Sequence, residues 1–133
     1  MRRYVIDAHV ALELGRTADR PAKGTQLVAP ALIRSELLCR LYRRVRAGEL
    51  SRQVAEEQLD HVRSLRIRLL GDRVLQRVAW DIADQLGWPD TLVAEYLALT
   101  RLQADAFVTL DDALSRTAAT VVPVATYEEL LRS

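Results

Sequence analysis

Two aspartates each follow a short apolar segment of this sequence. Asp7 follows residues 3–6 (RYVI), and Asp111 follows residues 106–110 (AFVTL). In open α/β sheets, ligands bind outside the carboxyl ends of the strands. If both segments are parallel strands, the two carboxylates lie at one sheet edge, where like charges repel unless a cation lies between them. For either aspartate alone, capping of the following helix is the better interpretation.

Two helical acids add to this pair. Glu36 lies among apolar neighbours on a helix expected over 31–47, a costly place for a carboxylate with no partner. Asp90 is expected in the first turn of its helix, where the helix dipole favours an acid. A solvated side chain is the alternative for Glu36, and a helix cap is the alternative for Asp90.

Four carboxylates gathered in one pocket favour a hard divalent cation. Mg²⁺ prefers oxygen ligands and usually keeps several waters, and such a site suits phosphodiester hydrolysis. The sequence has no Gly-rich phosphate loop, no GxSxG elbow and no HExxH motif. His9 and His61 are isolated and are interpreted as non-catalytic, although His9 is close enough to Asp7 in sequence to contact a phosphate.

The elements that must position these acids alternate between short apolar strands and amphipathic helices. Strands are expected over 3–6, 26–29, 106–110 and 120–122, while 67–70 is open between a strand and an extended connection. Helices are expected over 8–14 (closed by Gly15), 31–47 (with Pro30 in its first turn), 51–65 and 72–86, and from 89, 112 and 126 onward, with Leu92, Tyr96, Leu97 and Leu99 facing inward. This alternation predicts an α/β fold, a three-layer sandwich with a short central parallel sheet and helices on both faces.

Composition limits the class of protein further. The 133 residues predict a single domain, residues 1–133, and half of them are hydrophobic. Cys39 is the only cysteine, which excludes an internal disulfide and a cysteine-based zinc cluster. No apolar run is long enough for a signal peptide or a membrane span, so a cytoplasmic location is expected.

Net charge is +1, and all the basic residues but Lys23 are arginine. Arginine suits phosphates and can stack on bases, although solvated helix faces explain the composition better.

Three segments, in order, resemble the motifs of PIN domains. YVIDAHVALEL resembles the first motif, a hydrophobic strand ending in Asp, and APALIRSELL resembles the second, in which a helix supplies Glu. AEYLALTRLQADAFVTLDDAL resembles the C-terminal motif region, a helix leading into a strand that ends Thr-x-Asp. Their order and spacing are similar to those of VapC toxins of type II toxin–antitoxin pairs, over nearly the whole chain.

This resemblance implies an endoribonuclease that depends on Mg²⁺ or Mn²⁺, forms a homodimer and is silenced by a small antitoxin protein. Asp7, Glu36 and Asp111 match the first, second and last acids of the family, which would be catalytic and metal-binding. Thr109 matches a hydroxyl residue that supports the site.

The sequence departs from the family pattern at two positions. Family members commonly have Asp three residues before the tyrosine of the YLAL-like run, where this chain has Val93. Asp90, about one helical turn earlier, is expected to serve as the fourth metal ligand, and Glu95 is expected to face elsewhere. His9 stands where a small hydroxyl residue is usual.

Two other functions remain open at this stage. One is a PIN-like domain that binds RNA or a partner without cutting, and the other is an RNA-processing nuclease without an antitoxin. Arg40, Arg43, Arg44 and Arg46 share the helix of Glu36. They either follow the RNA backbone or hold an antitoxin tail, although a solvated face is the better interpretation for any single one.

Overall fold

The computed structural model describes residues 1–132 of the chain as a five-stranded parallel sheet with helices on both faces. The strand order is β3-β2-β1-β4-β5. The strands are β1 (Arg2–Ile6), β2 (Thr25–Ala29), β3 (Arg68–Leu69), β4 (Ala106–Val108) and β5 (Val124–Ala125). All four pairings are parallel, so the carboxyl ends of the strands lie at one edge of the sheet.

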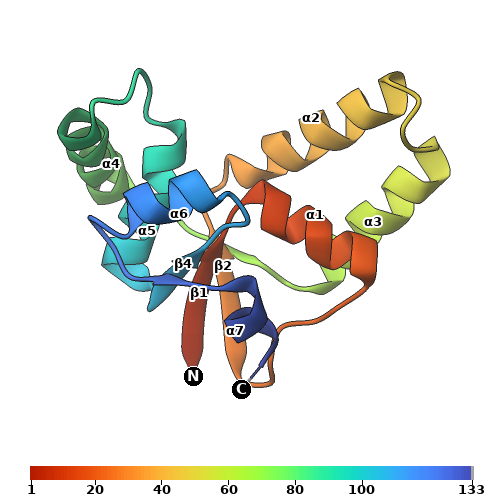
Figure 1. The fold of residues 1–133 in the computed structure, drawn as a ribbon, viewed down its shortest axis with the longest axis horizontal. Helices are drawn as coiled ribbons and strands as arrows, with labels where there is room; N and C mark the ends of the chain where they lie inside the picture. Colours follow the sequence, from red (N-terminus) through yellow and green to blue (C-terminus); the bar gives the residue numbers. More distant parts are fainter. Residues whose placement is uncertain (133) are drawn as a thin grey trace.

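Seven helices connect and cover these strands. They are α1 (Ala8–Thr17), α2 (Ile33–Arg46), α3 (Arg52–Ser64), α4 (Arg73–Leu86), α5 (Leu92–Gln103), α6 (Asp112–Ala118) and α7 (Tyr127–Leu131). Figure 1 shows α1 and α3 on one side of the strands and α4 and α5 on the other. The predicted α/β fold with helices on both faces is therefore confirmed. No helix within residues 1–132 has the length and apolar character needed to cross a bilayer.

One part of the core lies between the sheet and α5. The side chains of Val5 and Ile6 on the central strand β1 and of Phe107 on its neighbour β4 are completely buried. Leu97 on α5 is also fully buried, and every residue from Tyr96 to Thr100 is buried. A helix surrounded on nearly all sides has little freedom to shift, so α5 fixes the position of any polar group that it carries toward the sheet edge.

One predicted boundary is wrong at a glycine. Gly15 was expected to end the first helix, but α1 continues through it to Thr17. A Cβ at this position would lie 3.0 Å from the carbonyl oxygen of Gln58 on α3. Glycine at this position therefore permits the close approach of α1 and α3 rather than ending the helix.

The last predicted strand, 120–122, is also misplaced. Residues 120–122 form a turn in which the backbone N–H groups of Val121 and Val122 donate to the carbonyl of Ala118. Strand β5 follows at Val124–Ala125, where it pairs with β4. Two adjacent valines favour a strand by propensity, but the hydrogen bonds that end α6 have already fixed their backbone.

Other boundaries differ at helix starts. The helix expected over 31–47 begins at Ile33, which leaves Pro30 outside it, and α5 begins at Leu92 instead of residue 89. Leu92 is 52% exposed, so the prediction that it faces inward is wrong. The segment 67–70, which the sequence left open, contains the short strand β3.

Candidate active site at the carboxyl edge of the sheet

Asp7 lies immediately beyond β1 and is held by two donors. Its Oδ1 accepts a 3.0 Å hydrogen bond from the Val10 N–H, which caps α1, and its Oδ2 accepts a 2.7 Å hydrogen bond from the Thr109 hydroxyl. The register that pairs Ile6 with Val108 places Asp7 beside Thr109 at the sheet edge. Capping and a contact across the sheet therefore occur together at this aspartate.

Asp111 lies two residues after Thr109 and contacts the same hydroxyl. Its backbone N–H donates to Thr109 Oγ1 at 3.3 Å, and its Oδ1 accepts from the Leu114 N–H at 3.0 Å to cap α6. The side chain is exposed. Thr109 thus links the loops that follow β1 and β4, and one carboxylate oxygen of Asp111 stays outside the cap.

Glu36 reaches the same edge from α2 by binding Tyr96 on α5. The Tyr96 hydroxyl, on a side chain only 3% exposed, donates to Glu36 Oε1. A buried tyrosine hydroxyl needs a hydrogen-bond partner, and an ionised carboxylate is a strong acceptor. Sixty residues of sequence separate the two, so residue spacing alone did not point to this contact.

The pKa of Tyr96 reports on the charges around its hydroxyl. Burial raises this pKa far above the usual value for a phenol, and the hydrogen bond to Glu36 raises it further. The negative charges of Glu36, Asp7 and Glu95 add to the shift. Glu36 therefore contacts the phenol directly, while the charges of Asp7 and Glu95 act on it through space.

Glu95 was expected to face away from these acids, and that prediction is wrong. Its side chain is partly buried, and its pKa is raised first by burial and then by the charge of Glu36. Val93 occupies the family position, and the nearest preceding acid in the sequence is Asp90, so the sequence pattern pointed away from Glu95. Its place next to Tyr96, which the sequence pattern turned inward, was the signal available.

Asp90 lies outside α5 instead of in its first turn. It is exposed in the bend before the helix, where its Oδ1 accepts a 3.1 Å hydrogen bond from the Leu92 N–H. This contact two residues ahead is an Asx turn, and the N-cap of α5 is Thr91, so Asp90 is neither in the first turn nor the cap of the helix. A metal-binding role for Asp90 remains a prediction.

The donor chemistry of the site fits a hard divalent cation. As the side chains of residues 1–132 stand, no three of the His, Cys, Asp or Glu side chains come together closely enough to enclose a metal. Mg²⁺ usually retains several waters and binds only one or two carboxylates directly, so a complete cage is not required. Asp7 and Glu36, whose charges both raise the pKa of Tyr96, are the candidate pair.

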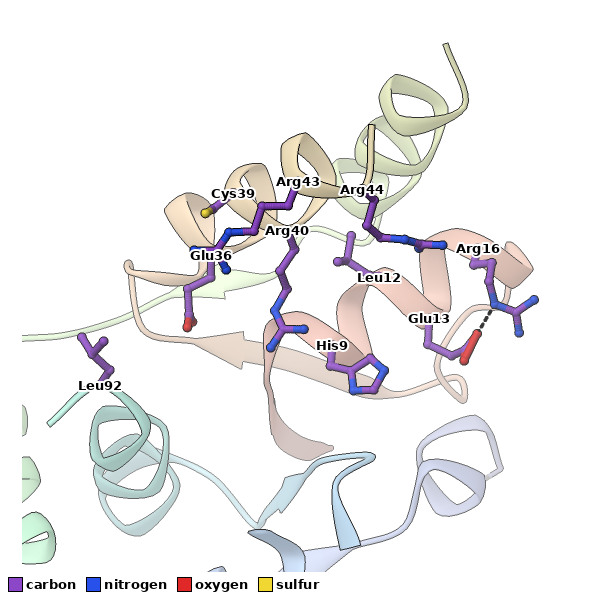
Figure 2. Close-up of a pocket in the computed structure, with 10 residues that line it drawn as sticks. All are labelled: His9, Leu12, Glu13, Arg16, Glu36, Cys39, Arg40, Arg43, Arg44 and Leu92. Carbon is purple, nitrogen blue, oxygen red and sulfur yellow. Dashed lines mark hydrogen bonds and ion pairs between the residues drawn. The ribbon is translucent and has the colours of Figure 1, made fainter. Parts of the chain in front are cut away.

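A cleft of about 800 Å³ opens beside Glu36 between α1 and α2, and we call it the α1–α2 cleft. Figure 2 shows Arg40 extending from α2 on the same side of the helix as the Glu36 carboxylate, toward His9 on α1. The cleft is lined by His9, Leu12, Glu13, Arg16, Glu36, Cys39, Arg40, Arg43, Arg44 and Leu92.

The fold is similar to that of a solved protein. The crystal structure of PAE2754 from Pyrobaculum aerophilum superimposes with a TM-score of 0.78 at 23% sequence identity, covering 98% of this chain and 93% of that one. No protein-family model matches the sequence, and no curated protein matches it. This similarity shows that the two proteins share a parallel α/β fold, and the strand order of this chain agrees with the fold expected from the sequence.

Proposed function

We propose that this protein is a metal-dependent endoribonuclease that hydrolyses RNA phosphodiester bonds. The observation that carries the proposal is the pair of hydrogen bonds that hold two carboxylates at the carboxyl edge of a parallel sheet, from Thr109 to Asp7 and from Tyr96 to Glu36. The charges of both acids also raise the pKa of Tyr96. Like charges in one region favour binding of a cation, and the sheet edge is where α/β folds bind their ligands. The PIN-like fold and the three resembling motifs support the same activity.

Each residue has a distinct task in this proposal. Asp7 and Glu36 would hold Mg²⁺ or Mn²⁺, and Asp111, through the oxygen outside its cap, would complete the acidic edge. When bound, the cation supplies the positive charge that activates water and stabilises the phosphoryl oxygens. Thr109 and Tyr96 keep Asp7 and Glu36 in place through their hydroxyl groups.

Glu95 is the better candidate than Asp90 for the remaining acid. The charge of Glu36 acts on Glu95, whereas the described contact of Asp90 is with the backbone of Leu92. Replacement of the family aspartate by Val93 is then compensated two residues later on the same helix.

The cellular role proposed here is that of a toxin in a toxin–antitoxin pair. This part of the proposal depends on the resemblance to VapC proteins, which also implies a homodimer, a small antitoxin and a cytoplasmic location. A short upstream reading frame encoding a DNA-binding antitoxin would support the toxin role. If it is absent, an RNA-processing nuclease is favoured.

A second candidate function is binding of RNA or a protein partner without cleavage. The engagement of both Asp7 oxygens by protein donors favours it, because a metal must then share or displace those contacts. Incubation of the purified protein with total RNA and Mg²⁺ or Mn²⁺ separates the two functions. Cleavage that EDTA and Asp7→Asn both abolish supports the nuclease, whereas intact RNA retarded on a gel supports the binder.

A further inference from the structure

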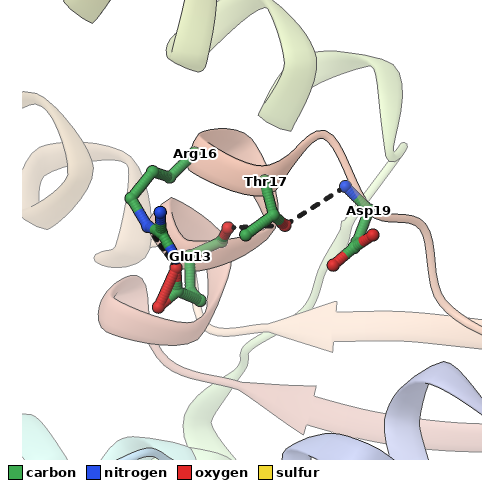
Figure 3. A network of polar contacts seen from close by, with 4 residues as sticks. All are labelled: Glu13, Arg16, Thr17 and Asp19. Atoms are coloured by element: carbon green, nitrogen blue, oxygen red, sulfur yellow. Dashed lines mark hydrogen bonds and ion pairs between the residues drawn. The ribbon is translucent and has the colours of Figure 1, made fainter.

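Two arginines in the α1–α2 cleft have no ion-pair partner among residues 1–132. Arg16 forms an ion pair with Glu13 at 2.5 Å, and Arg44 lies 3.5 Å from Glu49. Figure 3 shows the Glu13–Arg16 pair at the end of α1, beside the hydrogen bonds of Thr17. Within residues 1–132, no carboxylate lies within ion-pair distance of Arg40 or Arg43, the other two arginines that line the cleft.

The absence of a pair between Glu36 and Arg40 is informative. An acid four residues before a base on a helix is a favourable arrangement for an ion pair. Here the Glu36 carboxylate instead accepts from Tyr96, and the Arg40 guanidinium extends into the cleft. The Glu36 carboxylate and the Arg40 guanidinium therefore do not pair, although the two residues lie one helical turn from each other.

The order of charges along α2 matches a chain of phosphates. Glu36, Arg40 and Arg43 occupy successive turns and line one cleft, at intervals of about 6 Å and about 4.5 Å along the helix axis. A strand with its reacting phosphate at Glu36 would therefore pass its neighbouring phosphates along Arg40 and Arg43. Guanidinium groups bind phosphate oxygens through paired N–H donors.

The size of the cleft favours a single strand over a duplex. A volume of about 800 Å³ between two neighbouring helices is in the range of small-molecule sites. It admits a few nucleotides of one strand, and exposed Leu92 offers apolar surface to a base.

From these contacts we infer that the α1–α2 cleft is the binding subsite for the strand that flanks the cleaved bond, with Arg40 and Arg43 contacting its phosphates. This inference rests on the proposed function in taking RNA as the ligand. It implies that phosphates on one side of the reacting bond are held more firmly than those on the other. Because the contacts are to phosphates, binding should be insensitive to base sequence and to the sugar.

The test is direct binding in the Asp7→Asn background, which removes cleavage while asparagine retains the α1 cap. Binding of a short fluorescent oligouridylate is measured by anisotropy from roughly 50 to 200 mM salt. Adding Arg40→Gln and Arg43→Gln should weaken binding by about tenfold or more and reduce the log–log salt slope by about 1.4, or 0.7 per lost contact.

The matched control is Arg34→Gln with Arg46→Gln in the same background. These exposed residues lie on the same helix outside the cleft, so they remove equal charge from α2. The control should leave most of the slope unchanged. Equal losses in the two double variants, or an oligouridylate that does not bind at all, would overturn the inference.

Competitor ligands show which class of molecule occupies the α1–α2 cleft. Single-stranded DNA should bind nearly as well as RNA, and a duplex of the same sequence should bind more weakly. If binding of a polyglutamate peptide depends on Arg40 and Arg43 while binding of RNA does not, the cleft would be assigned to an acidic protein segment. That result would overturn the inference. Binding that depends on both arginines in a protein that never cleaves RNA would uphold the inference and refute the proposed nuclease function.

Discussion

The Thr109 hydroxyl donates a 2.7 Å hydrogen bond to the carboxylate of Asp7, 102 residues away in sequence. The same oxygen accepts from the backbone N–H of Asp111, so one hydroxyl sets the spacing between the two aspartates that follow β1 and β4. This arrangement needs the parallel register of the two strands and a hydroxyl at residue 109.

Thr109→Val removes this hydroxyl with almost no change in shape. We expect nuclease activity to fall by about 10- to 100-fold and the free energy of unfolding to fall by about 1–2 kcal/mol. Thr109→Ser should restore most of both, because it keeps the donor. Thr120→Val is the control, since that hydroxyl contacts only a turn carbonyl. Full activity in Thr109→Val would show that Asp7 needs no support from β4.

Tyr96→Phe tests the link between α5 and Glu36. It deletes the donor to Glu36 Oε1, and we expect a loss of about 1–3 kcal/mol in unfolding free energy at neutral pH, measured by urea denaturation in EDTA. Tyr42→Phe, at a tyrosine that is 63% exposed, should have no effect. Equal stability of both variants would indicate that the contact contributes nothing.

The raised pKa of Tyr96 also predicts how stability depends on alkaline pH. Above about pH 10 an unfolded chain loses the phenolic proton while the folded protein retains it, so the free energy of unfolding falls as pH rises. One such group contributes a slope of about 1.4 kcal/mol per pH unit, which Tyr96→Phe should remove. Burial also raises the pKa of Tyr127, so part of the slope should remain.

Two substitutions of Asp111 distinguish its role as a helix cap from a role in the reaction. Asp111→Asn retains a side-chain oxygen for the Leu114 N–H, whereas Asp111→Ala loses the cap and about 1 kcal/mol of stability. If the charge of Asp111 serves the reaction, both variants should lose activity by about 100-fold, although only the alanine variant melts at a lower temperature. Wild-type activity in Asp111→Asn would show that this residue serves only as a helix cap.

Glu95→Gln and Asp90→Asn decide which acid compensates for Val93. Removing the charge of Glu95 relieves its repulsion with Glu36, so the metal-free protein should melt at a higher temperature and gain less from added Mg²⁺. Asp90→Asn should leave both melting temperatures close to wild type, because asparagine can still accept from Leu92. The opposite pattern would return the assignment to Asp90.

The sequence was sufficient to predict a parallel sheet and the two aspartates that follow β1 and β4, but not the position of the last strand. Asp7 and Asp111 were identifiable because a strand end in a parallel sheet is also a site position, and local pattern defines both. The Tyr96–Glu36 contact was not predictable, since it depends on how α2 and α5 sit over the sheet. Glu95 and Gly15 were misjudged for the same reason, because tertiary neighbours decided their roles.

Crystals grown with Mn²⁺ and measured for anomalous scattering test the central claim most directly. In the wild-type protein we predict an anomalous peak from a Mn²⁺ ion bound by the carboxylates of Asp7 and Glu36, and in Asp7→Asn no such peak. A peak elsewhere on the molecule, or none at the carboxyl edge of the sheet, would contradict the assignment of this site.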